Sequence, residues 1–216
     1  MTGAVLFDLD GTLVDSEPGI RRCVDVTLAE HGFDPLGPGD LERFIGPPLR
    51  ESFAGLGVPA RSIDDLVATY RRHYAGGGIH EFTVYPGIPD LIAALTERGV
   101  LFGVATSKLT SSAEIVLVEA GLRAHLGFVV GSEPDGRRST KAAVVADALA
   151  PLDPGTASRA VMVGDREHDG VGARAAGIRF VGVEWGFGTR GELLAAGADP
   201  IASSPAELLA ALLDSR

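Results

Sequence analysis

Cysteine is nearly absent from this sequence of 216 residues, which contains only Cys23. A single cysteine excludes an internal disulfide and favours a reducing compartment, so we expect a cytoplasmic protein. Because no histidine-rich context surrounds Cys23, we interpret it as a small buried side chain on a helix rather than a nucleophile. The 5 histidines show no metal-ligand spacing, and no P-loop, Gly-x-Ser-x-Gly elbow or Cys-x-x-Cys pattern is present.

Long apolar runs and excess positive charge are also missing. Runs such as 115–118 and 208–213 are far shorter than the ~20 apolar residues that span a bilayer. The first residues lack the basic start and apolar stretch of a signal peptide. The formal net charge of −10 argues against a nucleic acid polymer or an anionic membrane as partner. An anionic substrate would therefore need local positive charge at its site.

Hydrophobic residues make up 45% of the chain and charged residues 22%, which suits an α/β domain with a sizeable core. Short apolar runs typical of buried strands recur at 5–7, 100–105, 128–130, 160–163 and 180–183. Helical patterns lie between them, at 89–98, 112–120, 140–149 and 170–176. Glycines expected to form left-handed C-caps end several helices, namely Gly99, Gly121 and Gly177. This alternation predicts an α/β fold with a doubly wound, Rossmann-like parallel sheet.

One part of the chain breaks the alternation, because residues 16–82 contain helical patterns and no convincing strand. Glycine and proline density just before and after its end predicts a flexible return into the core. We expect an α/β core at 1–15 and 83–216, with 16–82 inserted as an α-helical cap. Hinges are expected near 14–17 and 76–86. The alternative is a helical excursion packed rigidly on the sheet.

Acidic residues follow the first apolar run directly, in the pattern Asp-Leu-Asp-Gly-Thr at 8–12. In an open parallel sheet, ligands bind beyond the carboxyl ends of the strands. Residues two apart on an extended strand point the same way, so Asp8 and Asp10 can flank one site. Gly11 allows a sharp turn there, in which backbone N–H groups, including that of Thr12, can face an anion.

A second acidic strand end lies at 164–169, where Asp165 follows the run at 160–163 and Asp169 comes four residues later. If a helical turn has begun, the two carboxylates lie close together. Two carboxylates ~4 Å apart repel by about 4 kcal/mol at an effective dielectric near 20, so a cluster of them needs a cation. An all-oxygen ligand set that leaves room for phosphate suits Mg²⁺.

Two further sites supply hydroxyl groups and positive charge. Thr106 and Ser107 follow the strand pattern at 100–105, where a hydroxyl and helix N-terminal amides would hold a phosphoryl oxygen. The alternative for Thr106 is a plain helix N-cap. Lys141 opens a predicted helix, where the helix dipole disfavours a cation, which indicates a compensating anion. The alternative for Lys141 is an ordinary solvated lysine.

These residues together resemble the haloacid dehalogenase superfamily, and within it the phosphoglycolate phosphatase-like and 5′-nucleotidase-like branch with a helical cap. The resemblance covers essentially the whole chain and includes the insertion after the first motif. Its four motifs correspond to 8–12, Thr106, Lys141 and 164–169, and the stretches 44–49 and 182–188 are similar to that branch. Two positions depart from the usual pattern, with Ser107 in place of asparagine and Ala142 in place of proline.

The resemblance implies a Mg²⁺-dependent phosphatase that acts on a small-molecule phosphate ester. Asp8 would attack phosphorus and form an aspartyl-phosphate. Asp10 would first protonate the leaving oxygen and then deprotonate the hydrolytic water. Mg²⁺, Lys141 and Thr106 would stabilise charge on the transferred group.

The resemblance also implies the metal ligands and the substrate contacts. Asp8, Asp165 and Asp169 would hold the metal, together with Asp10, whose backbone carbonyl is the expected ligand atom. The cap would close over the site, with Gly46 and Arg50 as candidate substrate contacts. We expect a monomer or homodimer.

Four alternatives stay open. A sugar-phosphate mutase on the same fold would return the phosphoryl group to its substrate. A dehalogenase would attack carbon, but it needs neither metal nor a second acid at Asp10. A phospho-aspartate switch would be a binding module without turnover, and it needs no cap. A purely structural α/β domain would leave the polar strand ends unexplained.

Overall fold

A six-stranded parallel sheet forms the centre of the computed structural model, which describes residues 3–214. The strand order is β5-β4-β1-β6-β7-β8. The strands are β1 (Ala4–Phe7), β4 (Leu101–Leu109), β5 (Val129–Ser132), β6 (Val161–Gly164), β7 (Arg179–Val183) and β8 (Ile201–Ala202). Because the chain moves outward from β1 to β5 and then returns to β6 on the other side, the predicted doubly wound α/β sheet is confirmed. Residues 1–2 and 215–216 of the predicted core lie outside the described residues.

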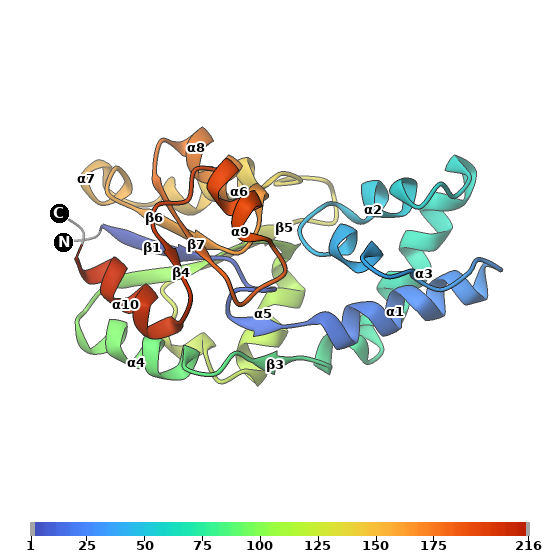
Figure 1. The fold of residues 1–216 in the computed structure, drawn as a ribbon, viewed down its shortest axis with the longest axis horizontal. Helices are drawn as coiled ribbons and strands as arrows, with labels where there is room; N and C mark the ends of the chain where they lie inside the picture. The colour runs from blue at the N-terminus through green and yellow to red at the C-terminus, as the bar shows by residue number, and fades with distance from the viewer. Residues whose placement is uncertain (1–2, 215–216) are drawn as a thin grey trace.

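Helices cover both faces of the sheet, as Figure 1 shows, with α6 and α8 above it and α4 and α10 below. The helices of this part are α4 (Ile88–Glu97), α5 (Thr110–Glu119), η4 (Arg123–His125), α6 (Lys141–Leu149), α7 (Pro154–Ala157), α8 (Glu167–Ala176), α9 (Arg190–Ala195) and α10 (Pro205–Leu213). The buried residues of α4 follow the 3.6-residue period of an amphipathic helix. No helix among the described residues is long and apolar enough to cross a membrane.

The sheet separates two hydrophobic cores, and β1 contributes to both because its side chains alternate between the faces. Val5 and Phe7 belong to the larger core, which includes residues of α4 and α10. Ala4 and Leu6 belong to the smaller core under α6 and α8. All four side chains are fully buried, so the end of β1 is held rigidly where the polar residues begin.

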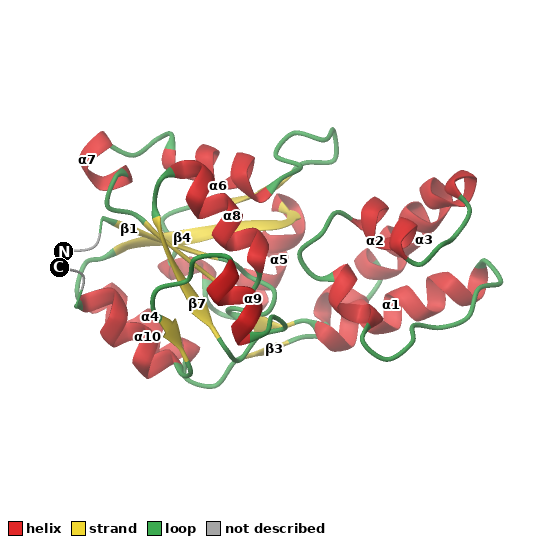
Figure 2. Ribbon diagram, turned by 45° about the horizontal axis from the view of Figure 1, so that its top comes forward, coloured by secondary structure: helices red, strands yellow, loops and turns green. Residues whose placement is uncertain are grey.

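Residues 16–82, called the helical segment below, lie to one side of the sheet and contain only helices and loops (Figure 2). They form α1 (Glu17–Glu30), η1 (Asp40–Phe44), α2 (Leu49–Gly55), η2 (Ala60–Ser62), α3 (Ile63–Ala75) and η3 (Gly78–His80). At its two ends, β2 (Val14–Asp15) and β3 (Thr83–Val84) pair as a short antiparallel ribbon. The two predicted hinge regions therefore meet side by side.

The observed elements differ from the sequence prediction mainly at their ends. The strand expected at 100–105 runs on to Leu109, with a register shift between Ala105 and Leu109 against β5. The helix expected at 170–176 begins already at Glu167. The short strands β2, β3 and β8 and the helices α9 and α10 were not predicted. The three predicted C-cap glycines all have positive φ, as expected: Gly99, Gly121 and Gly177.

Candidate active site

Three aspartates from two strand ends converge at the carboxyl edge of the sheet. One carboxylate oxygen each from Asp8, Asp165 and Asp169 lies within 4.8 Å of the others. Asp8 follows β1, while Asp165 and Asp169 follow β6, its neighbour in the sheet. All three side chains are buried. The sequence prediction that these strand ends share one acidic cluster therefore matches their placement.

The turn after β1 fixes Asp8 and brings Thr12 against Asp165. The Leu9 amide donates to Asp8 Oδ1 at 2.7 Å, and Gly11 has φ +81°, a left-handed conformation that favours glycine. A Cβ on Gly11 would overlap the Asp165 carboxylate, so the turn needs glycine for space as well. Thr12 Oγ1 donates to Asp165 Oδ1 at 3.1 Å. The amides of this turn, expected to face an anion, bond to the backbone instead: the Gly11 amide donates to the Val14 carbonyl at 2.8 Å and the Thr12 amide to the Leu9 carbonyl at 3.3 Å.

Backbone amides hold the other two carboxylates in place. The Phe187 amide donates to Asp165 Oδ2 at 2.8 Å, from the loop after β7. The Arg166 amide, at the N-cap position of α8, donates to Asp169 Oδ2 at 3.1 Å. Each carboxylate therefore has one oxygen anchored by the backbone.

Lys141 is the first residue of α6 and supplies the positive charge that the sequence predicted. Its Nζ lies 2.9 Å from Asp8 Oδ1 and 2.8 Å from Asp169 Oδ1, and it donates to the Ala105 carbonyl at 3.2 Å. The side chain is 3% exposed. Burial disfavours its charge, but Asp169 and Asp8 outweigh that effect and raise the pKa of Lys141. The cation that the helix dipole disfavours is thus compensated by two carboxylates.

The pKa values of the cluster show that its carboxylates crowd one another. Burial, followed by the charges of Asp169 and Asp8, raises the pKa of Asp165 to about 8. Burial also raises the pKa of Asp169 to about 6, although Lys141 acts in the opposite direction. A cation among these oxygens would relieve the repulsion. The donor set consists of carboxylate oxygens only, which fits a hard divalent ion such as Mg²⁺.

Asp10 lies beside the cluster, and its carboxylate faces a second lysine. Lys108 Nζ donates to Asp10 Oδ1 at 2.8 Å and to Oδ2 at 2.7 Å. The Asp10 carboxylate is not part of the three-aspartate group, so its side chain is not a metal ligand in this arrangement. The Asp10 backbone carbonyl stays the predicted ligand atom. Burial disfavours the charge of Lys108, but Asp10 and then Tyr74 outweigh it and raise the pKa of Lys108.

Thr106 and Ser107 lie within β4, one residue and two residues past the predicted strand end. Thr106 is buried, and its Oγ1 accepts a hydrogen bond from the Lys108 amide at 3.2 Å. The Ser107 carbonyl accepts from Ser132 Oγ at 2.9 Å. Because α5 begins only at Thr110, with Leu109 as its N-cap, the N-cap alternative for Thr106 is wrong.

Two substrate contacts were expected in the helical segment. Of these, Gly46 lies next to the α/β part of the chain and Arg50 does not. Gly46 has φ +105°, and a Cβ there would come within 3.0 Å of His168 Cδ2. Arg50 is exposed and pairs with Asp64 inside the helical segment. His168 is half-buried, and burial lowers its pKa.

Arg166 connects the core to the helical segment. Its Nη1 donates to the Glu42 carbonyl at 2.9 Å and to the Ile45 carbonyl at 2.7 Å. Its Nε donates to Glu192 Oε1 at 2.8 Å. The residue directly after Asp165 therefore binds the loop that contains Gly46.

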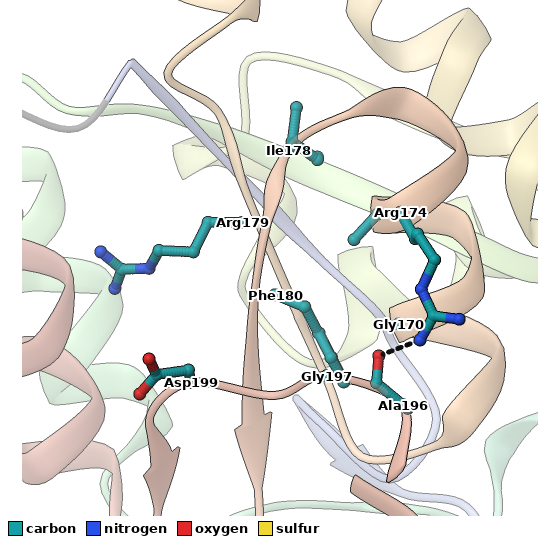
Figure 3. A pocket seen from close by; sticks show the side chains of 9 residues that line it. Gly170, Arg174, Ile178, Arg179, Phe180, Ala196, Gly197 and Asp199 are labelled. Atoms are coloured by element: carbon teal, nitrogen blue, oxygen red, sulfur yellow. Dashed lines mark hydrogen bonds between the residues drawn. The ribbon is translucent and has the colours of Figure 1, made fainter. Parts of the chain in front are cut away.

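Two hollows lie near these elements. One of about 210 Å³ lies between α1, η1 and Phe187, and its charged residues are Glu17, Arg21 and Glu42. The other, of about 270 Å³, lies between α8, β7 and the turn at 196–199 (Figure 3). There Arg174 Nη2 donates to the Ala196 carbonyl at 3.0 Å. None of the predicted site residues lines this second hollow.

The sequence of this chain matches a known protein family. The model of the haloacid dehalogenase-like hydrolases matches residues 5–183. The chain belongs to this family.

The chain is similar to several proteins whose names state an activity. Tyrosine-protein kinase PtkA of Mycobacterium tuberculosis is 40% identical over 185 residues, which are 85% of this chain and 62% of that protein. A 5′-nucleotidase of Pseudomonas aeruginosa is 38% identical over 192 residues, covering 88% of this chain and 86% of that protein. A phosphoglycolate phosphatase of Rhodospirillum rubrum is 35% identical, covering 87% of this chain and 81% of that protein. The chain thus spans less than two thirds of the length of PtkA.

A solved structure with a similar fold supports this family assignment. The crystal structure of a predicted phosphatase from Clostridium acetobutylicum has a TM-score of 0.91 and 36% identity, and the match covers 99% of both chains. The predicted family and fold class, those of a haloacid dehalogenase-like hydrolase, are confirmed by these matches.

Sequence reasoning missed several residues that shape this haloacid dehalogenase-like site. Lys108 and Arg166 stand in the motifs, but nothing in their spacing distinguishes them from solvated residues. The Phe187 amide is a backbone group and gives no side-chain signal. Trp185 Nε1 donates to the Thr12 carbonyl at 3.0 Å, a contact across most of the chain length. The only sequence signal for the Phe187 and Trp185 contacts was the resemblance of residues 182–188 to the phosphoglycolate phosphatase-like branch, from which no role was inferred.

Proposed function

We propose that this protein is a Mg²⁺-dependent phosphomonoesterase that hydrolyses a small phosphate ester through a phosphorylated Asp8. The observation that carries the proposal is the position of the Asp8 carboxylate, which contacts Lys141 and has an oxygen within 4.8 Å of those of Asp165 and Asp169. Its backbone and its neighbours hold it rigidly at the end of a buried strand. A nucleophile for phosphorus needs such fixed geometry and neighbouring positive charge.

Two steps account for the reaction. In the first, an Asp8 oxygen forms a bond to phosphorus, the bond to the leaving oxygen breaks, and Asp10 gives that oxygen a proton. In the second, water attacks phosphorus and gives a proton to Asp10, and the bond from phosphorus to Asp8 breaks. Lys141 and the Thr106 hydroxyl stabilise charge on the phosphoryl oxygens.

Asp8, Asp165 and Asp169, with the Asp10 carbonyl, would hold Mg²⁺. The ion supplies charge neutralisation for the phosphoryl oxygens when it is bound. We propose that the helical segment acts as the family's cap, with Gly46 at the contact surface. The leaving group would lie toward the helical segment, where the hollow of about 210 Å³ adjoins Phe187. We place the reaction in the cytoplasm, on the evidence of the single cysteine.

The test is phosphate release from a panel of phosphoglycolate, nucleoside monophosphates and sugar phosphates, with and without Mg²⁺. The two relatives named 5′-nucleotidase and phosphoglycolate phosphatase make those esters the first to measure. Asp8→Asn should abolish release while the thermal unfolding curve is retained, because an amide is a poor nucleophile. Turnover of p-nitrophenyl phosphate by Asp8→Asn would reject Asp8 as nucleophile.

A second candidate is transfer of the Asp8 phosphoryl group to a tyrosine hydroxyl. The 40% identity to the protein named PtkA favours it. It shares the first step and differs only in the acceptor of the second. Incubation with radiolabelled ATP and a tyrosine peptide separates the two, since a phosphatase yields inorganic phosphate and a kinase yields phosphopeptide. Return of phosphate to a sugar phosphate would indicate the mutase alternative instead.

A further inference from the structure

A second buried lysine, Lys108, contacts Asp10 and the helical segment at once. Both carboxylate oxygens of Asp10 accept hydrogen bonds from its Nζ. Among the described residues, no other group donates a hydrogen bond to this carboxylate. The ammonium group also contacts α3, where its Nζ lies 4.9 Å from the centroid of the Tyr74 ring. The Lys108–Asp10 pair is therefore enclosed by other parts of the protein, unlike a salt bridge on the protein surface.

Burial and backbone geometry fix Lys108 in this position. The side chain of Lys108 is 8% exposed and that of Asp10 is 15% exposed, so the pair is screened little by solvent. The register shift in β4 falls between Ala105 and Leu109, and such irregularities re-aim side chains at functional edges of sheets. The Lys108 amide donates to Thr106 Oγ1, which ties its backbone to a residue of the site.

The two buried lysines have separate partners. Lys141 pairs with Asp8 and Asp169, whereas Lys108 pairs with Asp10 alone. The proposed nucleophile and the proposed acid–base residue therefore each have a dedicated ammonium group. A lysine that served phosphate binding would be expected to face Asp8, as Lys141 does.

The aromatic contact comes from the helical segment. Tyr74 stacks on Tyr70, with ring centroids 5.6 Å apart and an interplanar angle of 10°. Both tyrosines are buried, so the ring that covers Lys108 is itself held by a neighbour. The position of α3 against the core thus determines whether the Tyr74 ring contacts the Lys108 ammonium group.

We infer that Lys108 is a positioning residue for Asp10 and that Tyr74 holds Lys108 in place from the helical segment. The inference rests on the proposed function, because it concerns the step in which Asp10 takes a proton from the hydrolytic water. In that step the bond from water oxygen to phosphorus forms, the bond from phosphorus to Asp8 breaks, and the proton goes to Asp10. The contact to two oxygens lets one of them turn toward water while the other stays on Lys108.

The experiment is pre-steady-state turnover of p-nitrophenyl phosphate with Mg²⁺ by Lys108→Met. p-Nitrophenolate is a stable anion that leaves without a proton, so phosphorylation of Asp8 does not need Asp10 with this substrate. Only hydrolysis of the phosphoenzyme then depends on Asp10. We expect a burst of one p-nitrophenol per enzyme, kcat lowered by about 10–10³-fold, and kcat/KM within about threefold of the parent, since acid–base catalysis contributes about 10²–10⁴-fold.

Three matched variants define the result. Asp10→Asn should give the same burst with a larger loss of kcat. Lys141→Met, at the other buried lysine, should lower kcat/KM and give no burst. Lys108→Arg should recover part of kcat, because a guanidinium group can still donate to both carboxylate oxygens.

Tyr74 is tested by a pair that separates ring from hydroxyl. Tyr74→Phe keeps the ring face but removes the hydroxyl, which also interacts with Lys108, so it should lower kcat less than Tyr74→Leu does. Tyr74→Leu removes the ring and should lower kcat by about 2–30-fold, the fold-change equivalent of a cation–π contact, with the same burst. The kcat of the parent in both variants would remove Tyr74 from the inference.

A double-mutant cycle keeps the inference testable if Lys108→Met folds less well. In the Asp10→Asn background, Lys108→Met should lower kcat by less than about threefold further, because residues that act as a unit are not additive. A burst-free Lys108→Met with lowered kcat/KM, or an additive double variant, would overturn the positioning role. A burst-free Asp10→Asn would instead reject the proposed acid–base function itself, so the two failures are distinguishable.

Discussion

Asp165 offers a direct test of the idea that the three-aspartate cluster is built to hold a cation. Its side chain is fully buried, and its pKa is raised from an ordinary 3.8 to about 8. A raised carboxyl pKa means that the folded protein binds this proton more tightly than the unfolded chain does. The resulting stability is complete below the unfolded pKa, near 4, and is lost as the pH rises through about 8.

The size of the effect follows from that shift. One pKa unit corresponds to about 1.4 kcal/mol, so this group should lower the free energy of unfolding of the metal-free protein by roughly 4 kcal/mol between pH 5 and pH 8. Asp165→Asn keeps the shape and an acceptor for the Phe187 amide, but it has no proton to lose. We expect the variant to match the parent at pH 5 within about 1 kcal/mol. At pH 8 it should be more stable by roughly 4 kcal/mol.

The assay is urea unfolding in the presence of a chelator at pH 5 and pH 8. Asp34→Asn is the matched control, because Asp34 is exposed and makes no hydrogen bond to another described residue, and it should follow the parent at both pH values. Replacing the chelator with Mg²⁺ at pH 8 should stabilise the parent and not Asp165→Asn. A variant that is less stable than the parent at pH 8 in chelator would refute the reasoning, since the carboxylate would then be satisfied without a cation.

Two further predictions concern neighbouring residues. Asp10→Asn should lengthen the lifetime of the phosphoenzyme by about 10²–10⁴-fold, measured by rapid quench, because the hydrolytic water loses its base; an unchanged lifetime would remove Asp10 from the second step. Lys141→Met should lower the free energy of unfolding in chelator by about 3–5 kcal/mol, measured by urea unfolding at pH 8, because Asp8 and Asp169 lose a buried cation. Equal stability of Lys141→Met and the parent would show that those two carboxylates do not depend on Lys141.

The sheet and the acidic cluster could be predicted because both follow from short-range rules. Apolar runs followed by aspartate mark the carboxyl ends of parallel strands, and such ends share one edge of the sheet. Asp8, Asp165 and Asp169 therefore had to approach one another once the strand order placed β1 beside β6. Lys141 was predictable for a similar reason, since a cation at a helix start needs an anion nearby.

The surroundings of Asp10 could not be predicted, because they depend on where β4 ends. With a strand end expected at 105, Thr106 was expected near helix N-terminal amides, and Lys108 was given no role. In the structure β4 continues to Leu109 through a register shift. No residue between 105 and 109 indicates this shift in the sequence. Arg50 illustrates the converse case, because its partner Asp64 lies in another helix of the same segment and no local pattern connects them.

Net charge alone gives a misleading picture of what this site can bind. The chain has a formal charge of −10, yet its two buried lysines both lie at the carboxyl edge of the sheet. The aspartates Asp8, Asp10, Asp165 and Asp169 exceed these two ammonium groups by two negative charges, which one divalent cation would neutralise. With that ion bound, a phosphate ester would meet a neutral site inside an acidic protein, because buried charges act over short distances and surface charges are screened by salt. The acidic surface would then slow the approach of the substrate more than it weakens binding, and added salt should raise kcat/KM more than kcat.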